Sequence, residues 1–169
     1  MARTVAIGHQ DFEQVIQNNY FYIDKTLFIK EWWENGDAVT LITRPRRFGK
    51  TLNMSMLEKF FSVDYAGRAD LFERLAIWQE KASNECYEYR QLQGTYPVIA
   101  LSFAKVKENV FANTKKRIIQ IIKDLYHEYA FLLDSDCLNS DEKEVFRKIS
   151  AEKEEYRIAD SLNILSNYL

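Results

Sequence analysis

The sequence predicts a helix-rich α/β fold in which a parallel sheet is flanked by helices. Two short apolar runs rich in β-branched residues, 38–43 and 96–103, are typical of buried strands. Longer segments between and after them repeat apolar residues every three or four positions, as amphipathic helices do. Such an alternation of strands and helices is typical of an α/β protein.

Composition excludes several classes of protein. The chain has 169 residues, which corresponds to one domain or to part of a larger one. A net charge of −2 gives no argument for a nucleic-acid partner. Cys86, Cys137, His9 and His127 are too scattered to form a metal site or a nucleophilic dyad. No apolar run approaches the roughly 20 residues of a membrane span, so we expect a soluble cytoplasmic protein.

The first half of the chain is expected to begin with a short helix over 9–19 and a short strand over 20–23. Asp24 stands at the N-cap position of the next predicted helix, 25–34, which Asn35-Gly36 ends. The strand 38–43 then leads through a turn into a helix. That helix repeats apolar residues every four positions: Leu52, Met56 and Phe60.

Further along, we expect a turn at 64–67, a helix over 70–79, and an ambiguous stretch, 80–94, that ends at Gly94. After strand 96–103 comes a long helix over 108–133. Its apolar stripe consists of Phe111, Ile118, Ile122, Leu125, Tyr129 and Leu132.

Asn139 and Glu142 form the sequence pattern of a capping box that opens another helix. The last predicted helix carries Ile158, Leu162, Leu165 and Leu169 on one face. Because that apolar face is still running at Leu169, we expect residues 1–169 to be the N-terminal part of a longer protein.

The turn between strand 38–43 and the following helix reads Arg44-Pro-Arg-Arg-Phe-Gly-Lys-Thr51. It matches the phosphate-binding P-loop, Gly-x4-Gly-Lys-Ser/Thr, at Gly49, Lys50 and Thr51, with Arg44 in place of the first glycine. Such a turn aims backbone N–H groups at a phosphate at the positive end of a helix. Lys50 is expected to meet the β- and γ-phosphates, and the Thr51 hydroxyl to ligate Mg²⁺.

The sequence therefore predicts a site for ATP, or another nucleoside triphosphate, with Mg²⁺. Lys50 and Thr51 are the predicted catalytic residues and Thr51 the metal ligand. The predicted nucleotide-binding residues are Asp24, Lys25, Arg44, Pro45, Arg46, Arg47, Phe48, Gly49, Lys50, Thr51 and Leu52. For Asp24 and Lys25 a helix cap followed by a surface lysine is an equal alternative. Arg46 and Arg47 either contact phosphate or are simply solvated.

Five segments together resemble the prokaryotic AAA-ATPase-like family. They are Tyr22-Ile-Asp-Lys-Thr26, the 44–51 loop, Phe60-Phe61, Leu71-Phe72 and Tyr96-Pro-Val98. The resemblance runs from about Ile7 to Leu169. It implies a bacterial P-loop NTPase-like domain that binds ATP and Mg²⁺, and it makes Arg44 the family's own variant. It also implies that a nuclease-like domain of the PD-(D/E)XK type often follows.

The family's Walker B strand, which ends in Asp-Glu-Tyr-Asp, is expected beyond Leu169. Phe131-Leu-Leu-Asp134 imitates it, but these residues continue the stripe of the long helix, so we interpret them as a helix end. Hydrolysis is therefore expected only in the complete protein. Two alternatives stay open: a nucleotide-binding switch without turnover, and a nucleic-acid or protein interaction module that uses the arginine-rich loop.

Overall fold

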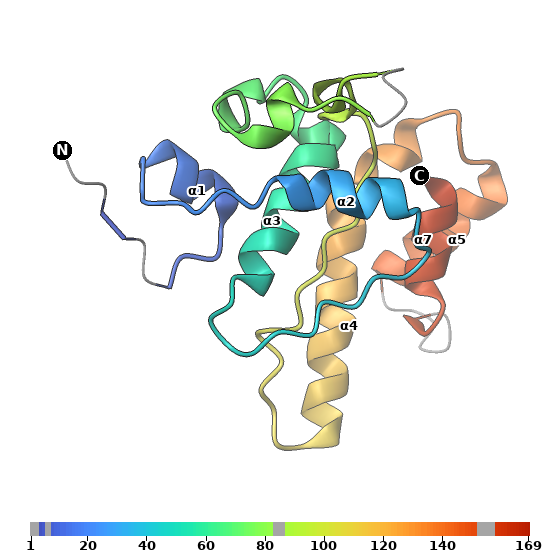
Figure 1. The fold of residues 1–169 in the computed structure, drawn as a ribbon. Coiled ribbons are helices and arrows are strands. Elements are labelled where there is room, and N and C mark those ends of the chain that lie inside the picture. Colours follow the sequence, from blue (N-terminus) through green and yellow to red (C-terminus); the bar gives the residue numbers. More distant parts are fainter. Residues whose placement is uncertain (1–3, 6–7, 83–86, 152–157) are drawn as a thin grey trace. The chain divides into compact units, whose positions relative to one another are not determined.

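The computed structural model describes residues 4–5, 8–82, 87–151 and 158–169. The chain divides into two compact units, Met1–Val98 and Ile99–Leu169, each with its own hydrophobic core. Nearly all regular structure in the described residues is helical (Figure 1). None of the helices described has both the length and the apolar composition that a membrane crossing requires.

In the first unit, the described residues form three α-helices and four short 3₁₀ helices. They are α1 (Phe12–Gln17), α2 (Leu27–Asn35), α3 (Lys50–Phe61), η1 (Val63–Tyr65), η2 (Ala69–Leu71), η3 (Ala76–Gln79) and η4 (Tyr89–Leu92). The helices predicted within 9–19, over 25–34 and after Gly49 are thus confirmed, and Gly36 ends α2 in the left-handed conformation. The single helix predicted over 70–79 is wrong, because η2 and η3 occupy that stretch as separate turns.

The core of the first unit is built on aromatic side chains. The Phe12 and Phe72 rings stack with centroids 5.1 Å apart, and Phe60 meets Phe72 edge-on at 5.1 Å. All three are fully buried. Polar contacts also hold α1 on α3, since the Phe12 N–H donates to Ser55 Oγ at 3.1 Å. Each buried ring contributes large apolar area, and the pair geometry adds about 0.5–1.5 kcal/mol per pair.

The predicted parallel sheet is wrong. Among the described residues the only β pairing consists of isolated bridges between Val5 and Phe21, Ser62 and Tyr96, and Lys81 and Glu88. The strand expected at 20–23 is therefore reduced to the bridge at Phe21, and the strand expected at 96–103 to the one at Tyr96.

Residues 38–43 form no bridge, and the side chains of Val39 and Leu41 are 86% and 83% exposed. A strand exists only when a neighbour accepts and donates its backbone hydrogen bonds. Apolar, β-branched composition favours an extended chain but does not specify that neighbour. Here no described segment pairs with 38–43, and most buried apolar side chains of both cores come from helices.

The second unit contains α4 (Phe111–Glu128), η5 (Ala130–Asp134), α5 (Ser140–Ser150) and α7 (Ser161–Tyr168). The Tyr126 ring lies 4.7 Å from that of Phe146, and its hydroxyl donates to the Ser161 carbonyl at 2.8 Å. These contacts tie α4 to α5 and α7, and burial raises the pKa of Tyr126 above its ordinary value.

In the second unit, two predictions that rest on short local sequence patterns are confirmed. The capping box is confirmed, with Asn139 Oδ1 accepting from Glu142 N–H at 2.9 Å and Glu142 Oε2 accepting from Asn139 N–H at 2.8 Å. The end of the long helix is confirmed as well, because residues 130–134 continue from α4 as a 3₁₀ turn. The predicted stripe is wrong only at its start, where the Phe111 side chain is 82% exposed.

Replacing Gly94 by Ala should destabilise the first unit strongly. Gly94 has φ +69°, and a Cβ there would lie 2.6 Å from the Ala66 Cα and 3.0 Å from its backbone nitrogen. The matched control is Gly67→Ala, because Gly67 has φ +80° but no atom within 4 Å of the added Cβ. We expect Gly67→Ala to cost about 1–2 kcal/mol from the left-handed conformation alone. Gly94→Ala should cost clearly more in urea unfolding, and equal losses would contradict the packing described here.

Candidate functional site

The loop at 44–49 leads directly into α3. Gly49 is the N-cap residue and has φ +76°, a conformation that an L side chain adopts only with strain. The first N–H groups of an α-helix have no partners within the helix, and no side chain caps this 12-residue one. The loop therefore presents the positive end of a helix dipole at Lys50 and Thr51.

Lys50 folds back over its own loop. Its Nζ donates to the carbonyl of Pro45 at 2.9 Å and also to the carbonyl of Arg44. Thr51, in the next position, is exposed. The guanidinium groups of the loop have no hydrogen-bond or ion-pair partner among the described residues, and all are exposed: Arg44, Arg46 and Arg47.

A second ammonium group reaches the same loop. A Cβ added at Gly49 would lie 3.7 Å from Lys25 Nζ, so this side chain lies against the loop at its glycine. The sequence left two possibilities for Lys25, a surface lysine or a residue beside the loop. The structure brings together Lys25 and Gly49, which are far apart in the chain.

Asp24 has a structural position. Its Oδ1 accepts from the Thr26 N–H at 2.8 Å and from Thr26 Oγ1 at 2.6 Å, and its Oδ2 accepts from the Ala76 N–H at 2.8 Å. The N-cap residue of α2 is Thr26, two positions later than predicted. Both carboxylate oxygens of Asp24 are thus engaged in holding the start of α2 and the start of η3.

Sequence reasoning missed two residues that support this arrangement. Thr26 is fully buried, and its Oγ1 accepts from the Ile77 N–H at 3.2 Å. The Tyr22 hydroxyl accepts from the Lys25 N–H at 3.4 Å, and burial raises the pKa of Tyr22 to about 12. Both lie in the Tyr22–Thr26 segment, whose compact pattern of aromatic, acidic and hydroxyl residues was the signal that could have found them.

Phe48 and Leu52, two further residues of the predicted nucleotide site, differ in their surroundings. Phe48 is 59% exposed, whereas Leu52 is half-buried and packs on the core of the first unit. In the described residues no three His, Cys, Asp or Glu side chains cluster where they could hold a metal ion.

A family model described as a predicted AAA-ATPase matches residues 6–164. The chain belongs to this family. A stretch of 76 residues of the AAA-ATPase-like chain is also 37% identical to an uncharacterized protein in the vnfD 5' region of Azotobacter chroococcum mcd 1. That stretch covers 44% of this chain and 14% of that protein's length. No solved structure matches.

The engagement of Asp24 in this AAA-ATPase-like chain predicts a stability defect in Asp24→Ala. Removing the carboxylate leaves the Thr26 and Ala76 N–H groups without an acceptor, which should cost about 1–3 kcal/mol in the free energy of unfolding. Asp37→Ala is the control, because Asp37 is exposed and has no partner among the described residues. Urea unfolding measures both, and an Asp24→Ala variant as stable as the control would contradict the structural role.

Proposed function

We propose that this chain binds a nucleoside triphosphate, in the first instance ATP, with Mg²⁺ at the loop 44–51. One observation carries the proposal: Gly49-Lys50-Thr51 opens a helix, with the ammonium groups of Lys50 and Lys25 both on the loop before it. Membership in a predicted AAA-ATPase family supports the same assignment.

The loop has the charge that a triphosphate needs. Arg44, Arg46, Arg47 and Lys50 lie within eight residues that contain no acidic side chain, and Lys25 adds a fifth cation. Lys50 now donates to neutral carbonyls. Because a phosphate adds the attraction of opposite charges to the hydrogen bond, it would compete successfully with neutral carbonyls for this ammonium group.

The metal would rely mainly on the nucleotide. Mg²⁺ keeps several waters and commonly takes one or two protein oxygens together with phosphate oxygens. The exposed Thr51 hydroxyl is the protein oxygen proposed here. Asp24 is left out, because its oxygens already accept from three donors.

Turnover needs more than this site contains. Efficient phosphoryl transfer uses an acidic residue on the metal and a group that orients the attacking water. Among the described residues, no three His, Cys, Asp or Glu side chains cluster where they could hold a metal ion. We therefore assign nucleotide binding to this chain, and hydrolysis to the whole protein in which such residues are supplied.

One observation favours a second candidate function. Arg46 and Arg47 are exposed, and no described residue pairs with them, so they are free to contact a nucleic-acid phosphate backbone instead of a nucleotide.

Lys50→Ala should abolish nucleotide-induced stabilisation of the chain. A ligand at a hundredfold excess over its Kd stabilises the folded state by about 2.7 kcal/mol, and Lys50 is the cation at the helix start that would contact the phosphates. Thermal unfolding with and without ATP–Mg²⁺ measures the effect. Lys107→Ala, at an exposed lysine of the other unit, should keep the full shift. Equal shifts in wild type and Lys50→Ala would refute the proposal.

Replacing Arg46 and Arg47 together by Gln should weaken ATP binding more than ADP binding. The additional γ-phosphate presents the oxygens that guanidinium groups bind best. Titration of wild type and variant with each nucleotide gives the two ratios. Loss of binding to a single-stranded oligonucleotide, with both nucleotide affinities unchanged, would instead identify the arginines as a nucleic-acid contact.

A further inference from the structure

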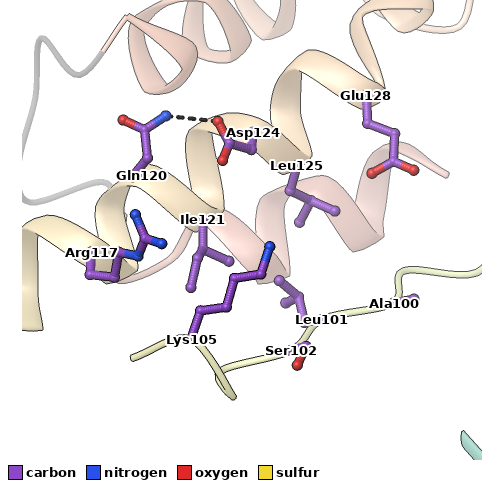
Figure 2. A pocket seen from close by; sticks show the side chains of 10 residues that line it. All are labelled: Ala100, Leu101, Ser102, Lys105, Arg117, Gln120, Ile121, Asp124, Leu125 and Glu128. Atoms are coloured by element: carbon purple, nitrogen blue, oxygen red, sulfur yellow. Dashed lines mark hydrogen bonds between the residues drawn. The ribbon is translucent and has the colours of Figure 1, made fainter. Parts of the chain in front are cut away.

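The second unit contains a cavity of about 290 Å³ whose lining includes no residue of the loop 44–51. It lies between the irregular segment at 100–105 and one face of α4 (Figure 2). Its apolar lining comes from Leu101, Ile121 and Leu125. Cavities for drug-sized ligands start at about 300 Å³, so this one suits a smaller molecule.

Charged side chains of both signs line the cavity in equal number. Lys105 and Arg117 are cationic, and Asp124 and Glu128 are anionic. Lys105, Arg117 and Glu128 have no hydrogen-bond or ion-pair partner among the residues that the structure describes. Asp124 accepts from Gln120 Nε2 at 2.7 Å through one oxygen, which leaves the other open.

The charges are separated along the helix. At a rise of about 1.5 Å per residue, Asp124 lies about 10 Å and Glu128 about 16 Å from Arg117 along the axis of α4. Figure 2 shows Arg117 and Glu128 at opposite ends of the lining, with the Lys105 side chain reaching up between them. Arg117 therefore marks a cationic end of the cavity and Glu128 an anionic end, with the Lys105 side chain and the apolar residues between them.

The segment opposite α4 adds unpaired backbone groups. Neither Ala100 nor Leu101 makes a backbone hydrogen bond within the described residues. Such N–H and C=O groups can bind an amide backbone that lies alongside them, as in strand addition.

We infer that this cavity binds a short zwitterionic peptide of two or three residues. An extended peptide spans about 3.3–3.6 Å per residue, so three residues match the ~10 Å between Arg117 and Asp124. The peptide's carboxylate would bind Arg117 and Lys105, its ammonium group would bind Asp124, and an apolar side chain would cover Ile121. A polyanion is a poorer fit, because two carboxylates face the same space as the two cations.

To test this, the tripeptide Ala-Leu-Ala is titrated into the full chain, and binding is monitored by ¹H–¹⁵N NMR. The free peptide should shift the resonances of Arg117, Ile121 and Glu128 in a saturable way. The N-acetylated and the C-amidated forms should each bind at least tenfold more weakly. Lys50→Ala should bind the peptide like wild type, since this site is independent of the proposed nucleotide site.

Variants assign each end. Arg117→Gln should lose the preference for a free carboxylate, and Asp124→Asn the preference for a free amine, whereas Lys107→Gln should keep both. Unchanged far-UV circular dichroism shows that a variant is folded. The inference is overturned if blocked and free peptides bind equally, if no shift saturates at millimolar peptide, or if ATP shifts these resonances more strongly than the peptide does.

Discussion

The hydrogen bonds of the Asp24 carboxylate fix the part of the first unit that carries Lys25. The carboxylate accepts from Thr26 twice and from the Ala76 N–H, and so joins the start of α2 to η3, more than fifty residues later in the chain. Thr26 Oγ1, which donates to Asp24, accepts in turn from Ile77. These contacts fix the backbone on both sides of Lys25, and Lys25 is the residue that reaches Gly49. A carboxylate with satisfied partners thus holds a cation at the loop.

Helix α3 connects the core with the candidate site. Its last turn carries Phe60, which is fully buried, and its first residue is Lys50. Near its end Lys59 is buried, pairs with Asp11 at 3.5 Å, and lies over the Tyr65 ring. Burial alone would lower the pKa of Lys59, but the Tyr65 contact and neighbouring acids outweigh it and raise the pKa. These contacts fix the C-terminal end of α3. Because α3 is one continuous helix, they also restrict the position of its N-terminal end, where the loop 44–49 begins the helix.

The sequence predicted what is encoded locally. The Asn139–Glu142 capping box, Gly36 after α2 and the helix that starts at Lys50 each depend on a few adjacent residues, and all are present. The prediction of a parallel sheet is wrong because strand pairing is non-local. Residues 38–43 have the composition of a strand, yet no segment among the described residues pairs with them. For the same reason the sequence identified Lys50 and Thr51 as neighbours but left the place of Lys25 open. That place depends on Ala76 and Ile77, whose backbone groups carry no sequence signal.

The ligands proposed for the two units differ in net charge. The loop 44–51 contains cations and no acid, and the Asp24 carboxylate, next to the Lys25 that reaches the loop, is engaged by three donors. This arrangement attracts multiply charged phosphates. The α4 cavity has as many carboxylates as cations, and Asp124 and Glu128 would repel a triphosphate that approached Lys105 and Arg117. A zwitterion loses little by this balance, because each of its charges faces an opposite one. The ligands proposed for the two units differ because the loop, together with Lys25, carries five cations and no acid, whereas the cavity holds two cations and two carboxylates.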